Sequence, residues 1–298
     1  MNFKLNERAK TSKVLETFKV YVEDDRSFKI FNWIRIFYFS MLVSLMVSCS
    51  SIQTKQQTNA DFFESFESKG SVKQNLRLDK IERKGWELTS EENTHGNYGL
   101  KITLNEGDKS KNKTERAEFQ DPEKLDLDQE VWYRLDFKIP EDFPDVDKRT
   151  VFWQLKQDGG NNPLVSMRFR NGELSIKQRF SFQQIKYSSL KKLSNVKNVW
   201  KRLVLQTYIS TSNSGFINIY LDDELIVSYH GQTAYASQPE KTYFKFGLYR
   251  DQTELPMHMF FDNYIRGQSW DEVVPEGGIV IPDKSVLWSN HLKKLESE

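Results

Sequence analysis

Residues 243–249 alternate polar and apolar side chains in a way that can present chemistry on one side only. In this segment, YFKFGLY, the odd-numbered positions are Tyr243, Lys245, Gly247 and Tyr249, and the even-numbered positions are Phe, Phe and Leu. Successive side chains of a β-strand point to opposite faces. We therefore expect the Phe and Leu side chains to be buried, and two phenols and an ammonium group to face something polar. A phenol with a pKa near 10 can take or give a proton if neighbouring cations lower that pKa.

Two other segments repeat this parity. In residues 153–156 (WQLK), Gln154 and Lys156 share the polar side, and in residues 116–119 (RAEF), Arg116 and Glu118 share it. Any solvated sheet face carries such residues, so the pattern alone leaves both a plain surface and a binding or catalytic face open. Gly247 favours the second interpretation, because a glycine inside a strand often marks the close approach of a ligand or of another backbone.

Short strands must position these side chains. From Phe62 onward, short alternating runs are separated by Gly, Asn, Asp and Pro, and no long run has helical spacing. Examples are LKITL (100–104), WYRLDFKI (132–139), VFWQLK (151–156), FINIYL (216–221) and MFFDNYI (259–265). More than ten such strands in about 215 residues predict a single all-β domain with the architecture of a sandwich or jelly roll.

Composition and charge limit the classes of protein to which this chain can belong. The chain has 298 residues, of which 13% are aromatic, which is ample for a packed core and argues against disorder. With 43 basic and 42 acidic residues the net charge is +1, which argues against binding of nucleic acid by bulk charge. Residues 1–48 hold eight Lys or Arg and five Asp or Glu, which leaves 35 basic and 37 acidic residues, a net charge of −2, in the remainder. The single cysteine, Cys49, excludes an internal disulfide and cysteine-rich zinc modules.

The N-terminal region is typical of an export signal. Residues 36–47 carry no charge, follow the basic residues Lys29 and Arg35, and precede small residues. This run is shorter than the approximately 20 residues of a transmembrane helix and indicates a secretory signal. Residues 45–49 (LMVSC) resemble a bacterial lipobox, which implies that Cys49 becomes the lipidated first residue of an exported, membrane-anchored lipoprotein in the periplasm or on the cell surface.

Two alternatives to this export interpretation stay open. Residues 36–47 could instead form a buried core helix that ends in a buried free Cys49. The stretch before the basic flank is long for a leader, so either the start codon lies further along or the export interpretation is wrong. The expected organisation is a leader over residues 1–49, a polar tether over 50–61, one domain over 62–275 and a C-terminal tail over 276–298.

The three strand motifs resemble those of jelly-roll polysaccharide lyases. Arg116-Ala-Glu118, Gln154-Leu-Lys156 and Tyr243-Phe-Lys245-Phe-Gly247-Leu-Tyr249 look like the Arg-x-Glu, Gln-Ile-His and Tyr-Phe-Lys-Ala-Gly-x-Tyr strands of alginate lyases of this architecture, in the same order. The wider pattern, with Trp200, residues 215–222, residues 261–264 and Val274-Pro275, is closer to the heparin-lyase-like and glucuronan-lyase group. The resemblance covers roughly residues 62–275 and implies a concanavalin-like β-jelly-roll sandwich.

The resemblance implies β-elimination at a uronic acid. In this reaction Arg or Gln donors neutralise the uronate carboxylate, a base removes the C5 proton, and an acid protonates the leaving O4. By resemblance Tyr249 is the catalytic tyrosine, and Arg116 and Gln154 bind the carboxylate. The implied substrate is an anionic polysaccharide such as glucuronan, ulvan, alginate or a heparin-like polymer.

The resemblance assigns the remaining positions less directly. Lys245, Tyr243 and Glu118 would contact the substrate at neighbouring positions. Lys156 stands where the alginate-lyase pattern has His, so it could act as the base or only as the charge neutraliser. We prefer Tyr249 as both base and acid.

Histidines and metal ions offer weaker signals. None of the four histidines has metal-ligand spacing, and His230, which follows a predicted strand, could reach the substrate from the rim or be an ordinary surface residue. No cofactor is required, but related jelly rolls often hold a structural calcium ion between the first and last strands. Glu67 (or Glu64) and Asp262 could supply its oxygen ligands, or could simply be solvated acids.

Two other functions compete with the lyase interpretation. The same sandwich could hold a glycan without cleaving it, as a carbohydrate-binding surface lipoprotein. A glycoside hydrolase would need two carboxylates about 5–9.5 Å apart, and no strand shows the Glu-x-Asp-x-x-Glu type of spacing that would supply them.

Overall fold

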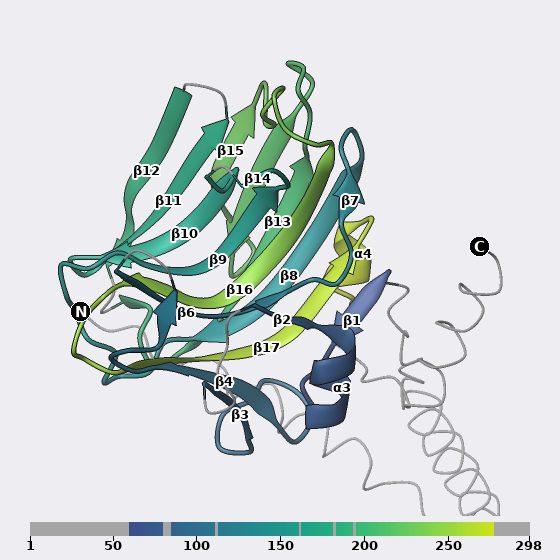
Figure 1. The fold of residues 1–298 in the computed structure, drawn as a ribbon. Helices are drawn as coiled ribbons and strands as arrows, with labels where there is room; N and C mark the ends of the chain where they lie inside the picture. Colours follow the sequence, from purple (N-terminus) through teal and green to yellow (C-terminus); the bar gives the residue numbers. More distant parts are fainter. Residues whose placement is uncertain are drawn as a thin grey trace, which may run out of the picture. The chain divides into compact units, whose positions relative to one another are not determined.

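The computed structural model describes residues 60–79, 85–110, 113–160, 162–180, 183–192 and 195–276, and in these ranges most of the chain forms two antiparallel sheets (Figure 1). The predicted leader and Cys49, most of the tether, and the tail after residue 276 lie outside the described residues. In the part that is described, no helix is both long and apolar enough to cross a membrane.

The first sheet has eight described strands in the order β15-β14-β13-β8-β17-β4-β3, with β1 paired to β17. Their bounds are β1 Phe62–Glu64, β3 Trp86–Thr89, β4 Gly99–Leu104, β8 Glu130–Lys138, β13 Trp200–Tyr208, β14 Phe216–Leu221, β15 Glu224–His230 and β17 Met257–Gly267.

The second sheet has nine described strands in the order β12-β11-β10-β9-β16-β6-β2, with β5 paired to β6 and β7 paired to β16. Their bounds are β2 Arg77–Asp79, β5 Lys109–Ser110, β6 Thr114–Gln120, β7 Leu125–Asp126, β9 Thr150–Gln157, β10 Val165–Arg170, β11 Glu173–Phe180, β12 Gln183–Lys192 and β16 Lys241–Asp251.

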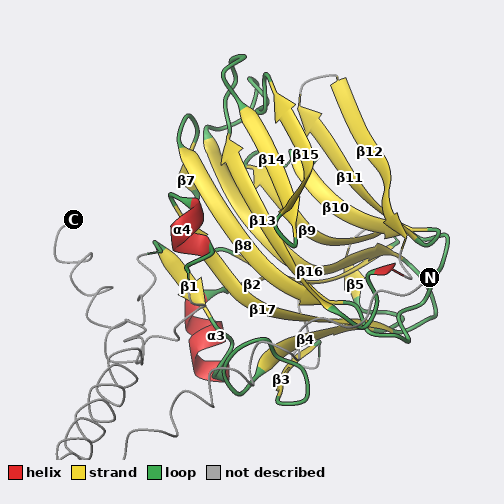
Figure 2. Ribbon diagram, turned by 180° about the vertical axis from the view of Figure 1, so that it is seen from behind, coloured by secondary structure: helices red, strands yellow, loops and turns green. Residues whose placement is uncertain are grey.

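Two short helices complete the described fold. Helix α3 (Lys69–Asn75) contacts β1 and β2, and α4 (Trp270–Val273) contacts β8 and β17. Both lie at the same edge of the sandwich as β1, as Figure 2 shows from behind. Each helix begins at a serine whose side chain accepts a backbone N–H of the first turn, Ser68 for α3 and Ser269 for α4.

The core lies between the two sheets. Phe244 of β16 stacks on Tyr133 of β8 with ring centroids 5.1 Å apart, and Phe152 of β9 meets Phe137 of β8 at 4.8 Å. These four side chains are almost completely buried, and each such burial stabilises the fold by about 1.5–3 kcal/mol. The predicted all-β sandwich is therefore confirmed.

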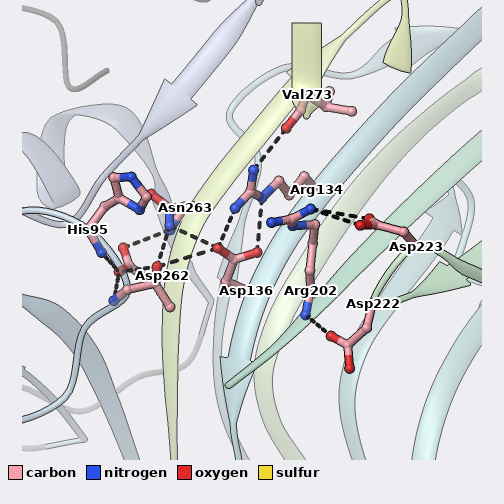
Figure 3. Close-up of polar contacts among 10 residues, drawn as sticks. His95, Arg134, Asp136, Arg202, Asp222, Asp223, Asp262, Asn263 and Val273 are labelled. Carbon is pink, nitrogen blue, oxygen red and sulfur yellow. Dashed lines mark hydrogen bonds and ion pairs between the residues drawn. The ribbon is translucent and has the colours of Figure 1, made fainter. Parts of the chain in front are cut away.

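Turn residues also behave as predicted. Asp222 and Asp223 join β14 to β15 with φ values of 51° and 68°, the positive pair that a two-residue hairpin turn of type I′ requires. Figure 3 shows Arg202 of β13 holding this turn: its backbone N–H donates to Asp222, and its guanidinium donates to Asp223 at 3.2 Å.

Gly247 sits at an irregularity in the middle of β16. The register of β16 against β9 shifts between Phe246 and Tyr249, and Gly247 has φ +129°. A Cβ at this position would lie 2.3 Å from the carbonyl oxygen of Ala117 on β6. The close approach that this glycine indicates is thus to the neighbouring strand β6.

Candidate active site

The fold brings the three strand motifs side by side. Strands β9, β16 and β6 are consecutive in the second sheet, with Lys245 opposite Gln154 on one side and Gly247 opposite Glu118 on the other. The apolar residues of these strands pack into the core. The polar residues of the three motifs alternate with these apolar residues and therefore share the face of the sheet that points away from the first sheet, which we call the outer face.

The Glu118 carboxylate is the centre of a buried polar cluster on the outer face. It accepts a hydrogen bond from Gln154 Nε2 at 2.5 Å, and its Oε2 lies 3.1 Å from Arg116 Nε and 3.4 Å from Lys245 Nζ. Glu118 is only 1% exposed, Gln154 3% and Lys245 4%. Instead of reaching outward to a substrate, as predicted, Glu118 is engaged by the three side chains around it and holds them in place.

Tyr249 lies at the edge of this cluster with cations over its ring. The Arg116 guanidinium carbon lies 4.3 Å from the ring centroid and that of Arg149 lies at 4.7 Å. Burial raises the pKa of the Tyr249 phenol, but Arg149, Arg116 and a hydrogen bond with Thr114 lower it by more, so the net pKa lies below its ordinary value. A phenol in this setting gives up its proton more readily than a solvated one.

Two arginines of the outer face were not predicted. Arg168 of β10 donates to Ser166 at 3.0 Å, and burial, together with repulsion from Arg149, lowers the pKa of Arg168 to about 10. Its position could have been inferred, because VSMRFR (165–170) has the same parity as the three motifs. Arg149 precedes β9 in a turn, where no periodicity predicts the direction of a side chain.

Lys156 and Tyr243 lie at the other end of the site. They face each other across β9 and β16, whereas Tyr249 pairs with Val151. Gln154 therefore lies between Lys156 and the residues around Tyr249 along β9. The ring of Tyr243 lies 5.8 Å from Lys124 Nζ, which adds a cation at this end.

His230 is not brought to this site. It ends β15, an edge strand of the first sheet, is exposed, and packs against Phe216 with ring centroids 5.9 Å apart. The predicted contact of His230 with the substrate has no counterpart on the outer face.

The acids named as possible calcium ligands accept hydrogen bonds from the protein. Glu67 accepts the backbone N–H groups of Asn97 and Tyr98, and Asp262 accepts those of Thr94 and His95 (Figure 3). Glu64 is engaged in the same way by Ser71 and Asn75 of α3. Among the described residues, no group of three or more His, Cys, Asp or Glu side chains could hold a metal ion.

Comparison with known proteins decides the family. A family model described as "Polysaccharide lyase" matches residues 51–265, which is most of the chain. The chain belongs to this polysaccharide lyase family. The predicted family is thereby confirmed, and the protein is a polysaccharide lyase. None of the curated proteins matches the sequence.

Solved structures confirm the fold of the lyase. An endo-β-1,4-glucuronan lyase from the fungus Trichoderma reesei aligns with a TM-score of 0.62 at 16% identity, covering 74% of this chain and 100% of the fungal chain. The alginate lyase vAL-1 from Chlorella virus aligns with a TM-score of 0.50 at 9% identity, covering 71% of this chain and 100% of the viral one. At such identities the likeness shows the fold alone, and it confirms the predicted jelly roll.

Proposed function

We propose that the lyase cleaves a uronic-acid-containing anionic polysaccharide by β-elimination on the outer face of β6, β9 and β16. The observation that carries this proposal is the placement of the Tyr249 ring under two guanidinium groups, one of which, Arg116, shares the Glu118 carboxylate with the Gln154 amide. A proton-transfer group and carboxylate-binding groups on one face are what elimination at a uronate requires.

The elimination divides among these side chains as follows. Arg116 and Gln154 bind the uronate carboxylate and stabilise the negative charge that spreads onto it when C5 loses its proton. The Tyr249 phenolate takes the C5 proton, the electron pair of that C–H bond forms the C4–C5 double bond, and the C4–O4 bond breaks. Tyr249 then returns the proton to O4. The products are a chain with a free hydroxyl and a chain that ends in an unsaturated uronate.

Local charge supports an anionic substrate. In the Glu118 cluster two cations, Arg116 and Lys245, surround one carboxylate, which leaves a positive charge for the substrate. Arg149 and Arg168 lie close to Asp251 and add a second net positive charge nearby. The outer face therefore concentrates cations in a molecule whose overall net charge is only +1.

Lys156 is assigned to binding, and not to the elimination itself. It lies beside Tyr243, on the far side of Gln154 from the end of β16 that carries Tyr249. We propose that Lys156 and Tyr243 contact a neighbouring sugar of the polymer. Under this assignment Lys156→Gln raises KM more than it lowers kcat.

The test follows the ultraviolet absorbance of the unsaturated uronate during incubation with glucuronan, alginate, ulvan and heparin. We expect the absorbance to rise with at least one of these polymers and not with its carboxyl-reduced form, which keeps the glycosidic linkages and lacks the carboxylate. Absence of the signal with every uronate polymer would overturn the proposal.

We also propose that the lyase is exported and anchored to a membrane through a lipid on Cys49. The sequence of residues 45–49 supports this proposal. The full-length protein expressed in a bacterial host is expected to enter the detergent phase in a phase-separation assay, and the Cys49→Ala variant is expected to stay in the aqueous phase. Equal partitioning of the two proteins would overturn the anchor.

A further inference from the structure

Arg149 is held rigidly although it lies outside any strand. Its Nη2 pairs with Asp251 Oδ1 at 2.8 Å, and its backbone N–H donates to Asp251 Oδ2 at 3.3 Å. The Asp251 backbone N–H in turn donates to the Arg149 carbonyl oxygen at 3.0 Å. Asp251 thus fixes the backbone and the guanidinium of Arg149 together, at the C-terminal end of the strand that carries Tyr249.

This anchoring places the Arg149 guanidinium against the phenol of Tyr249. The guanidinium carbon lies 4.7 Å from the ring centroid, and the side chain forms a hydrogen bond with Tyr249. A guanidinium is planar, permanently charged and suited to stacking on aromatic rings. It can therefore fix the orientation of the ring and stabilise a negative charge on its oxygen.

Charged and polar groups reach Tyr249 from each strand packed around it. Arg116 and Thr114 come from β6, Arg168 from β10, and Asp251 from β16 itself, while Arg149 comes from the turn before β9. Arg116 also forms an ion pair with the buried Glu118, in which its Nε lies 3.1 Å from Oε2 of the carboxylate. Burial is the largest single influence on the pKa of Tyr249 and raises it, and Arg149 is the largest of the opposing influences.

We propose that Arg149 is a positioning residue that orients the Tyr249 ring and stabilises its phenolate, with Asp251 as the anchor of Arg149. The inference rests on the proposed function, in which Tyr249 exchanges a proton with the substrate. It goes beyond that function because Arg149 belongs to none of the three strand motifs.

A titration of Tyr249 by NMR tests the proposal without relying on turnover. The full chain is labelled with carbon-13 at the phenol carbon of its tyrosines, and the Tyr249 signal is assigned as the one missing from Tyr249→Phe. In Arg149→Gln the midpoint of the Tyr249 titration is expected to rise by about one pH unit or more, and in Arg149→Lys, which keeps the charge but not the planar group, by less.

Arg170→Gln is the matched control. Arg170 is an exposed arginine of β10 that forms a comparable ion pair with Asp147, at 2.7 Å. This variant should leave the Tyr249 midpoint where it is in the unchanged protein. An equal shift in Arg170→Gln and Arg149→Gln would overturn the specific role of Arg149.

Kinetics provide the second readout. If the phenolate is the base, the rising limb of the pH profile of kcat should move to higher pH in Arg149→Gln by the same interval as the NMR midpoint, and kcat near neutral pH should fall about tenfold for each pH unit of that shift. An unchanged NMR midpoint in both Arg149 variants would overturn the proposal. A lyase-inactive unchanged protein would instead overturn the proposed function, while the NMR titration would still report on Arg149.

Discussion

At the scale of single residues, Arg116 joins two features of the site. Its Nε lies 3.1 Å from Glu118, and its guanidinium carbon lies 4.3 Å from the centre of the Tyr249 ring. Glu118 also receives Gln154 and Lys245. The buried carboxylate thus orients the groups that would bind a substrate carboxylate, while the same arginine favours ionisation of the phenol.

Replacing Glu118 by Gln removes the charge from this cluster with little change of shape. The buried Lys245 and the partly buried Arg116 then lose their counter-charge. We expect this to destabilise the protein by about 3 kcal/mol and to lower kcat/KM by about 10- to 100-fold through misplaced donors. Denaturant unfolding and steady-state kinetics measure the two effects. Glu106→Gln, at an exposed position, is the control, and a Glu118→Gln variant that matches it in both measurements would contradict this role.

The face of the sheet to which most site side chains point could be predicted from the sequence. The residues that they contact could not. Period-two alternation placed Arg116, Gln154 and Tyr249 on one face, as the structure shows. The contacts of Glu118 depend on which strands pair and in which register, and those pairings join residues far apart in the chain. Arg149 lies in a turn, where alternation carries no information.

At the scale of elements, β16 combines a regular strand with one irregular step. Its N-terminal half is in register with β9 up to Phe246, and pairing resumes at Tyr249 with a shift. Gly247 permits this step because its φ of +129° and its close contact with Ala117 exclude a side chain.

Gly247→Ala is therefore expected to disrupt the site through the backbone. The added Cβ would lie 2.3 Å from the Ala117 carbonyl oxygen, so β16 or β6 must shift, at a cost of about 3 kcal/mol or more. Gly107→Ala is the control, since Gly107 also has a positive φ, of +91°, but its Cβ would meet nothing within 4 Å. Thermal unfolding should show a much larger loss of Tm for Gly247→Ala, and equal losses would refute the steric account.

The Asp262 carboxylate of β17 accepts hydrogen bonds from the loop around residues 94–95, and its pKa is raised. Burial raises the pKa of Asp262 to about 6, against hydrogen bonds from Thr94, His95 and Asn263 that lower it. Because the folded state holds this proton more tightly than the unfolded state, whose pKa is near 3.8, the free energy of unfolding should fall as pH rises from about 4 to about 6.

Denaturant unfolding across this pH range checks the prediction. The decrease should amount to at most about 3 kcal/mol from Asp262, and it should be smaller in Asp262→Asn than in the unchanged protein. Glu64 and Asp121, whose pKa values burial also raises, act with the same sign and remain in the variant. Asp271→Asn, at an exposed position, should keep the full decrease, and an Asp262→Asn variant that also keeps it would contradict the assignment.

Most long strands follow the sequence pattern closely, and the short elements do not. Strand β14 begins and ends at the predicted residues 216 and 221. Helix α3 was not predicted, because only Val72 of its seven residues is buried and no helical periodicity results. The helix is stabilised by its N-cap at Ser68 and by the hydrogen bonds that Ser71 and Asn75 donate to Glu64.

At the scale of the whole molecule, charge is arranged locally. The net charge of +1 becomes −2 when residues 1–48 are left out, so long-range attraction does not account for binding a polyanion. Short-range attraction would come from the cations on the outer face of β6, β9, β10 and β16 and from Arg149. A jelly roll can host many functions, and this cluster on one face is what supports the proposal of a uronate polymer as the substrate.

The salt concentration should therefore affect KM for the polysaccharide more than it affects kcat. Between about 0.05 M and about 0.5 M NaCl, screening shortens the reach of exposed charges to a few ångströms, and KM for the polysaccharide should rise several-fold. The buried Glu118 cluster is screened less, so kcat should change by less than about twofold. Initial rates at a series of salt concentrations measure both values, and a fall of kcat at constant KM would contradict this division.

The most direct test of the central claim compares product formation by the unchanged lyase, Tyr249→Phe and Tyr243→Phe on the polymer that the lyase cleaves best. Both tyrosines lie on β16 with the same parity, but only Tyr249 has the two arginines over its ring. Loss of a group that both takes and returns the proton should lower the rate of unsaturated uronate formation by about 10³-fold or more in Tyr249→Phe, whereas Tyr243→Phe should stay within about tenfold. A Tyr249→Phe variant that retains the full rate would contradict the account.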